Sequence, residues 1–301
     1  MSRLIVAAAL SAGIGSCSVI YDEDNCPDNF VVDADWMYAP DARPDEMAYF
    51  FFSDAEKKAV WRFDFAGREG GEVSLPDGTF AAIALNDDNG YNVVSDPSVG
   101  YDEMTVTTLP AKLYVNDGSG PDNLDVEAVL RSPSQLWLSV GSTVCRPEDA
   151  RLIVYPRAMM AKYTCEVVRI VNLNGVKRMS GAITGMASEL KLADESRCGA
   201  AVTVPFSVGR VGDDKVLGSL LTIGRRDNCN DLHKLWLFVW LTDGRYFTYS
   251  FDVTSQVVEA SDPMDVHIKI EGLSLPESAA GGGAFDVSVD GWQETIIDIN
   301  G

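Results

Sequence analysis

The chain has 301 residues, of which 46% are hydrophobic, and it carries a formal net charge of -21. This length suffices for one large or two ordinary domains with hydrophobic cores. The acidity argues against nucleic-acid or anionic-lipid binding, because the phosphate-driven part of such affinity needs clustered Lys and Arg. We therefore expect no nucleic-acid partner.

Residues 1–16 are predicted to be a lipoprotein signal peptide. They carry one positive charge, at Arg3, followed by an apolar stretch much shorter than the about 20 residues that span a bilayer. The stretch ends in Ile14-Gly-Ser-Cys17, an aliphatic residue and two small ones before cysteine, as in sites cut by bacterial lipoprotein signal peptidase. Lipid on Cys17 would then hold the protein in a membrane. The alternative is an ordinary signal peptide with a cysteine there by chance.

Residues 17–29 are predicted to form a lipidated, acidic tether. Asp22-Glu-Asp24 follows the lipid site closely, and the segment has too few apolar residues to order itself.

Without Cys17, five of the six cysteines remain, namely Cys26, Cys145, Cys165, Cys198 and Cys229. Because this number is odd, at least one thiol stays free or pairs between chains. No Cys-x-x-Cys pair occurs, which argues against zinc. Cys198 and Cys229 could form one bridge in an oxidising compartment, and the other pairings stay open.

From residue 30 onward the pattern is β almost throughout, with short apolar runs between turn residues. In the first half the predicted strands are Tyr49–Phe52, Trp61–Phe65, Thr79–Leu85 and Leu136–Val140, with tight turns at Asp77-Gly78 and Asp117-Gly118. Pro147-Glu-Asp-Ala150 marks the predicted domain boundary. We therefore expect an N-terminal β-sandwich over residues 30–149 and a C-terminal one over 150–301.

The second half begins with an apolar run at Arg151–Pro156 and a predicted strand at Tyr163–Val171, and it ends with predicted strands at Asp265–Ile270 and Thr295–Ile299. Its clearest element is a hairpin of Lys234–Thr242 and Arg245–Val253 around Asp243-Gly244. A two-residue loop would place Trp240 opposite Phe247, Phe238 opposite Tyr249 and Trp236 opposite Phe251. This ladder could bind sugar, but burial in a sandwich core is favoured.

No catalytic motif is present, and we expect no enzyme activity, cofactor or metal. His233 and His267 lie in or beside predicted strands, which favours structural roles. The 45 acidic residues are too many to single out a glycosidase carboxylate pair. Asn86-Asp-Asp-Asn-Gly90 has oxygen ligands and a glycine turn that would suit calcium, but it lacks the spacing of a helix-loop-helix site, which favours a solvated turn.

Several segments, in this order, resemble the fimbrillin superfamily, two-domain surface lipoproteins related to fimbrium-anchoring subunits. They are Asp22–Pro27, Asp35–Pro40, Phe63–Gly71, Ser180–Met186, Phe251–Thr254 and Asp290–Trp292. The resemblance implies an all-β fold of two tandem transthyretin-like β-sandwich domains. It also implies outer-membrane attachment through Cys17, display at the cell surface, and assembly with fimbrial subunits by β-strand addition.

The leading hypothesis is therefore a lipid-anchored fimbrium anchor or accessory assembly subunit that takes part in cell adhesion. The alternative is a solitary surface lipoprotein that binds a glycan or host protein through exposed aromatic side chains such as Trp36, Tyr38 or Trp61. An enzyme comes last.

Overall fold

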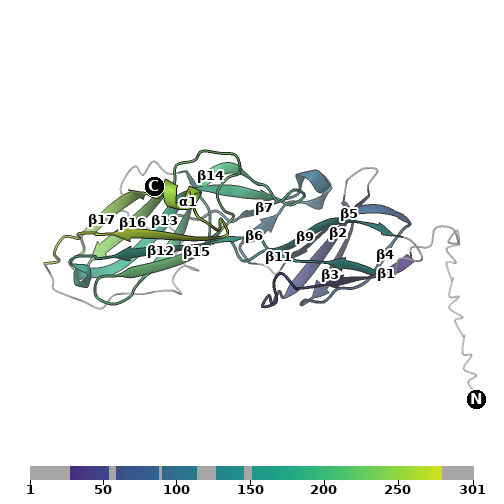
Figure 1. The fold of residues 1–301 in the computed structure, drawn as a ribbon, viewed down its shortest axis with the longest axis horizontal. Helices are drawn as coiled ribbons and strands as arrows, with labels where there is room; N and C mark the ends of the chain where they lie inside the picture. Colours follow the sequence, from purple (N-terminus) through teal and green to yellow (C-terminus); the bar gives the residue numbers. More distant parts are fainter. Residues whose placement is uncertain (1–27, 54–58, 88–89, 114–126, 146–150, 280–301) are drawn as a thin grey trace, which may run out of the picture.

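The computed structural model describes residues 28–53, 59–87, 90–113, 127–145 and 151–279. The molecule is elongated and consists of two β lobes arranged along its long axis (Figure 1). The predicted all-β fold is confirmed. Helix in the described ranges is limited to α1 (Thr254–Val258) and the short 3-10 helices η2 (Pro97–Val99), η3 (Tyr101–Glu103) and η4 (Leu173–Gly175). None of the helices in these ranges is long and apolar enough to cross a membrane.

The N-terminal lobe packs a five-stranded sheet against a three-stranded one. The orders are β11-β9-β5-β2-β3 and β10-β1-β4. Their bounds are β1 (Asp28–Ala34), β2 (Glu46–Ser53), β3 (Ala59–Ala66), β4 (Gly71–Leu75), β5 (Gly78–Asn86), β9 (Trp137–Cys145), β10 (Arg151–Val154) and β11 (Arg157–Ala158). Strands β2, β3, β5 and β9 confirm the four predictions made for the first half of the chain.

Strand β2 is buried on both faces, which accounts for its unbroken apolar sequence. Only its terminal residues, Glu46 and Ser53, are partly exposed. Tyr49 and Phe51 point into the core between the two sheets of the lobe. Phe50 and Phe52 point to the opposite face, toward the second lobe. A strand with one face in water would instead alternate apolar and polar residues.

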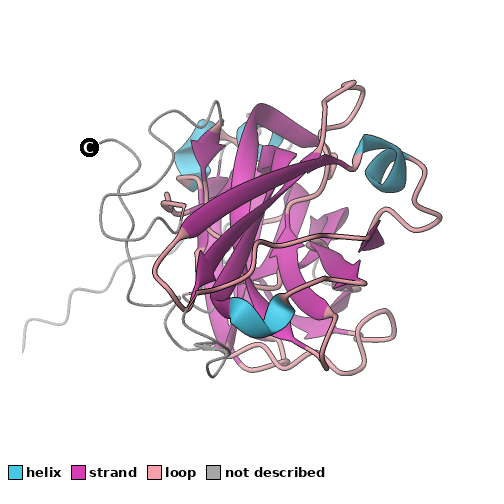
Figure 2. Ribbon diagram, turned by 90° about the vertical axis from the view of Figure 1, so that its left-hand side faces the viewer, coloured by secondary structure: helices cyan, strands magenta, loops and turns pink. Residues whose placement is uncertain are grey.

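The C-terminal lobe is a sandwich whose two layers share strand β14. The order is β17-β16-β13-β14-β15-β12-β18. Residues 197–207 of β14 pair with β13, and residues 208–210 pair with β15, so the strand passes from one layer to the other. The bounds are β12 (Ala161–Val168), β13 (Val176–Lys191), β14 (Arg197–Arg210), β15 (Val216–Thr222), β16 (Lys234–Leu241), β17 (Tyr246–Asp252) and β18 (Asp265–Glu271). Figure 2 views this lobe from its end.

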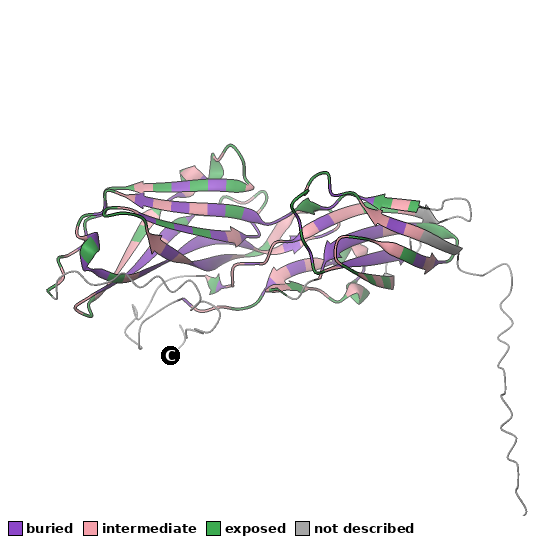
Figure 3. Cartoon of the chain, turned by 90° about the horizontal axis from the view of Figure 1, so that it is seen from below, coloured by how far each residue is buried: buried purple, intermediate pink, exposed green. Residues whose placement is uncertain are grey.

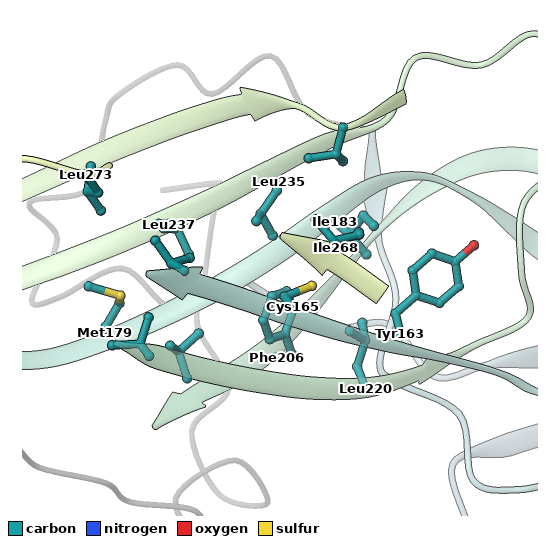
Figure 4. Close-up of a cluster of buried hydrophobic side chains, with 14 of the residues drawn as sticks. Tyr163, Cys165, Met179, Ile183, Phe206, Leu220, Leu235, Leu237, Ile268 and Leu273 are labelled. Carbon is teal, nitrogen blue, oxygen red and sulfur yellow. The ribbon is translucent and has the colours of Figure 1, made fainter. Parts of the chain in front are cut away.

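The core between these layers is apolar and closely packed. Tyr163 and Cys165 of β12 lie beside Phe206 of β14 and Leu235 of β16 (Figure 4), and each is at most 3% exposed. Burial raises the pKa of the Cys165 thiol to about 12. This cysteine is therefore a packing residue and not a reactive thiol.

A further apolar cluster joins the two lobes. Phe50, Phe52 and Ile83 of the N-terminal lobe contribute to it, together with Leu190 and Leu192 at the end of β13, and each is at most 1% exposed. Buried residues continue through the junction between the lobes (Figure 3). An interface of this apolar character fixes the position of two domains more firmly than the polar contacts usual between domains.

Strands from the middle of the chain extend the second lobe toward the first. Strand β7 (Thr105–Thr108) pairs with β13, β6 (Asn92–Val94) pairs with β7, and β8 (Ala128–Val129) pairs with β14. The predicted boundary between residues 149 and 150 lies outside the described residues. The sheets do not divide there, because β10 and β11 follow it and pair with β1 and β9. The parallel β1–β10 pair joins distant segments, which no local pattern could predict.

Strand β13 changes direction at a β-bulge between Ile183 and Met186. Gly185 in this bulge has φ +78°, and a Cβ there would lie 2.6 Å from Nδ1 of the buried His233. The bulge lets one strand pair with β16 inside the lobe and with β7 at the junction. Ser180–Met186, one of the segments that carry the family resemblance, contains this bulge.

The β16–β17 hairpin forms as predicted, but its predicted register is wrong by one residue. Trp240 lies opposite Tyr246 and Phe238 opposite Thr248. Leu241 N donates to Arg245 O over 2.8 Å, so the loop has three residues and ends at Gly244, whose φ is +85°. A left-handed residue closes three-residue loops of this kind, whereas the prediction assumed two residues.

The one-residue shift moves the aromatic side chains of β17 to the other face of the sheet. Phe247, Tyr249 and Phe251 pack against the core between the layers. Phe238 and Trp240 belong to a cluster on the opposite face, together with Leu113, Val129 and Ala182. The expected aromatic ladder on one face is therefore not formed, although burial of the β16 aromatics agrees with the core interpretation.

Candidate interaction surfaces

Cys17, the signal peptide and residues 17–27 of the acidic tether lie outside the described residues, as do Cys26 and the predicted strand Thr295–Ile299. The predicted end of the tether at residue 29 is wrong, because Asp28 and Asn29 already belong to β1 and pair with β4. Cys165, Cys198 and Cys229 are free thiols. The bridge considered between Cys198 and Cys229 is not formed. Cys198 lies in β14 opposite Glu189, whereas Cys229 lies in a loop that already has an internal Arg226–Asp231 ion pair at 2.5 Å.

The segment considered for calcium uses its first two oxygen-bearing side chains within the protein. Asn86 Nδ2 donates to Gln135 O over 3.0 Å, and Trp137 N donates to Asn86 Oδ1 over 2.7 Å. Arg62 donates to Asp87 over 2.5 Å. Residues 88 and 89 lie outside the described ranges, within which no three His, Cys, Asp or Glu side chains gather as metal ligands would.

The two histidines occupy different surroundings. His233 is 2% exposed, and its Nδ1 lies 3.1 Å from Thr184 O beside the β13 bulge. Burial lowers its pKa, which favours the neutral ring. His267 lies on β18 with more than half of its side chain exposed, 3.5 Å from Glu166. His233 therefore has the surroundings of a packing residue.

Two of the three aromatic residues considered for ligand contact are engaged within the N-terminal lobe. Trp36 is 7% exposed, and its Nε1 donates to Arg68 O over 2.9 Å. Trp61 is partly buried, with its ring centroid 5.2 Å from that of Phe80. Tyr38 alone of the three is strongly exposed, at 63%. The sequence pattern did not indicate its neighbour Tyr155. That residue follows β10, and β10 lies beside Tyr38 only because it pairs with the distant strand β1.

Strand addition needs an edge whose main chain is accessible. The edge formed by β18 is not, because a side chain already bonds its main chain. Lys269 N donates to Gln256 Oε1 over 2.7 Å, and Gln256 Nε2 donates to Lys269 O over 3.1 Å. The Gln256 amide of α1 thus occupies the hydrogen-bonding position of a neighbouring strand. Asp265, His267, Lys269 and Glu271 also place polar or charged side chains along this edge. Both features oppose pairing with another chain.

Strand β17 forms the other edge of the same sheet and has few of these features. From Tyr246 to Phe251 it carries no charged residue and no proline. Leu241 N donates to Arg245 O and Val253 N donates to His233 O, so the odd-numbered residues bond to β16. The main-chain groups of Thr248 and Ser250 consequently face away from β16. Among the strand edges in the described ranges, β17 has the longest uncharged stretch, from Tyr246 to Phe251.

Known structures share this fold. A "putative adhesin" from Bacteroides ovatus is 16% identical with a TM-score of 0.65, over 83% of this chain and 94% of that one. The fimbrial anchor protein Mfa2 from Porphyromonas gingivalis is 12% identical with a TM-score of 0.53, over 82% and 91%. A structure described as "putative polysaccharide binding proteins" from Bacteroides thetaiotaomicron is 10% identical with a TM-score of 0.52, over 84% of this chain and 93% of that one. The resemblance to fimbrillin-type surface proteins is thus confirmed at the level of fold.

No curated protein matches the chain. A family model does match, over residues 19–207, and its description is a domain of unknown function, DUF5119. Because the match covers more than half of the 301 residues, the chain belongs to the DUF5119 family.

Proposed function

We propose that this protein is a lipid-anchored cell-surface protein that acts as a fimbrium anchor or accessory assembly subunit. The observation that carries the proposal is the likeness to a fimbrial anchor, which spans 82% of this chain and 91% of that protein and so includes both lobes. Fold alone does not determine function. The second support is the sequence Ile14-Gly-Ser-Cys17, which would supply the lipid that an anchor needs.

The acidic segment Asp22-Glu-Asp24 supports placement at the outer face of the outer membrane. In related lipoproteins, a run of this kind soon after the cysteine promotes display on the outer leaflet. Ser18 after the lipid site is also not the aspartate that retains enteric lipoproteins in the inner membrane. The role is then mechanical and not enzymatic: the lipid resists withdrawal, and the β lobes hold the fibre.

The partner would be a fimbrial subunit that adds a β-strand to the edge of β17. An added strand would gain main-chain hydrogen bonds at Thr248 and Ser250 and contacts with the half-buried aromatic side chains of β17. At β18 the same addition would first have to displace Gln256 from Lys269. A proline substitution should therefore weaken strand addition at the β17 edge and have no effect on it at the β18 edge.

Thr248→Pro tests this partner site. Proline removes the N–H that faces away from β16, and an edge position whose N–H is not used within the sheet tolerates it. We expect the variant to fold but to lose most of its association with fibres. The measurement is the fraction of protein that co-purifies with fibres sheared from cells, with circular dichroism to confirm folding.

His267→Pro is the matched control, because its N–H also faces away from its sheet but lies on the edge closed by Gln256. It should co-purify with fibres as the unmodified protein does. Normal recovery of Thr248→Pro, or equal loss in both folded variants, would contradict strand addition at β17.

A further inference from the structure

The loop after β1 presents two large side chains to solvent. Met37 is 61% exposed and Tyr38 is 63% exposed. Their main chain forms a tight turn, in which Ala39 N donates to Trp36 O over 3.0 Å and Met37 N donates to Asp35 Oδ1 over 3.1 Å. Single exposed apolar residues are ordinary, but two neighbours fixed in one turn suggest a contact surface.

The turn is held firmly from beneath. The Trp36 ring packs edge-on against Trp137, with centroids 6.2 Å apart, and the Arg68 guanidinium lies 5.0 Å from its centroid. Arg43 and Arg68 each donate to Pro40 O over 3.1 Å. Because the backbone that carries Tyr38 is already fixed, a ligand that binds this side chain has little ordering to impose.

Tyr155 completes the surface from a distant part of the chain. Its ring centroid lies 6.4 Å from that of Tyr38, with 67° between the planes, and it is 43% exposed. Tyr155 N donates to Ser139 Oγ over 3.1 Å, which holds its main chain against β9. Ile153, 45% exposed, lies two residues earlier in β10, and side chains two residues apart in an extended chain point to the same side. We call Met37, Tyr38, Ile153 and Tyr155 the tyrosine platform.

The size of the platform favours a small ligand. A stable protein interface buries about 800 Å² on each partner, whereas a whole aromatic side chain offers only about 150–250 Å². Four partly exposed side chains therefore cannot form such an interface by themselves. The rings of Tyr38 and Tyr155, set at an angle to each other, are of a size to contact a ligand of one or two rings.

The charges around the platform favour a neutral ligand. The Asp33 carboxylate, opposite Ile153, is ion-paired with Arg151, and Asp35 accepts the hydrogen bond from Met37 N. Asp41 lies in the same loop, and the whole chain has a formal charge of -21. Arg43 and Arg68 lie under the same loop, so the charges of both signs offset each other near the platform. Such a balance gives an ionic ligand no net local attraction, and the negative charge of the whole chain repels sulfated or carboxylated molecules.

We propose that the tyrosine platform binds a neutral pyranose saccharide. One face of a pyranose ring carries C–H groups that pack on an aromatic ring, while its hydroxyls can bond the phenol oxygens and the neighbouring carboxylates. Small-molecule sites commonly combine apolar surface with a few polar groups in this way. The inference is independent of fibre assembly, because it concerns a different lobe and a different chemistry from the β17 edge.

The experiment applies the full-length protein to immobilised gluco-, galacto- and manno-configured oligosaccharides, with carboxylated and sulfated oligosaccharides on the same surface. Binding is expected on neutral members only. Tyr38→Ala and Tyr155→Ala should each lower the affinity by about tenfold, as expected of residues at the centre of a contact. Tyr38→Phe keeps the ring and should stay within about threefold of the unmodified protein.

Leu232→Ala is the matched control, because Leu232 is 66% exposed and lies on the C-terminal lobe. It should bind as the unmodified protein does. Three outcomes would overturn the proposal: no binding to any saccharide, binding confined to the acidic members, or unchanged binding by both alanine variants of the platform. Circular dichroism of each variant separates loss of binding from loss of folding.

Discussion

Cys17→Ala should transfer the protein from the membrane fraction to the soluble fraction and abolish its labelling with palmitate. Each buried methylene of an acyl chain contributes about 0.8 kcal/mol of membrane affinity, and anchors with more than one chain hold their protein stably. Without the thiol there is no site for the lipid. The expected loss is therefore nearly complete.

Cys26→Ala is the control, since it removes the nearest other cysteine and leaves the predicted cleavage site intact. It should retain both labelling and membrane attachment. If Cys17→Ala protein still incorporates palmitate, the lipid assignment is wrong. If it loses label but stays with the membrane, lipid is not what holds it there.

Phe50→Ala should destabilise both lobes together. Phe50 is 1% exposed and belongs to the cluster that joins β2 to the end of β13. Truncation of a buried phenylalanine costs about 3–5 kcal/mol, because apolar contacts are lost and a cavity remains. Val258→Ala, at a 46% exposed position in α1, should change stability by less than about 0.5 kcal/mol.

Hydrogen exchange read by mass spectrometry shows whether the lobes are coupled. If the junction makes them one cooperative unit, Phe50→Ala should increase exchange in β16, which lies in the other lobe, as well as in β2. Faster exchange confined to β2 and its neighbours would show that the lobes unfold independently.

The sequence predicted local structure well, because the apolar runs and the turn residues carry it. The run at Tyr49–Phe52 lies in β2, and the run at Lys234–Thr242 forms β16 up to Leu241. The prediction was wrong for the register of the β16–β17 hairpin, where a difference of one loop residue changes the pairing. Asp243-Gly244 correctly marked a hairpin, but a loop of three residues and not two reversed the faces of Phe247 and Tyr249.

Pairings between distant segments could not be predicted. The β10 strand follows the predicted boundary directly, yet it pairs with β1. The contact of the Gln256 amide with the β18 edge likewise could not be read from the short sequence of α1, Thr254–Val258. Of the aromatic residues considered for ligands, burial removed Trp36, and the same long-range pairing brought Tyr155 beside Tyr38. The sequence therefore identified aromatic residues as candidates for ligand contact, whereas the pairing of distant strands determined which of them lie side by side.

The most direct test of the proposed role is the state of surface fibres after deletion of the gene. Electron microscopy would give their number and length, and immunoblotting would give the proportion of fibre protein in the medium. An anchor or assembly subunit predicts fibres that are shed, lengthened or absent, with recovery when the unmodified gene is restored. Fibres of unchanged number, length and cell attachment would contradict a fimbrial role and favour a solitary surface lipoprotein.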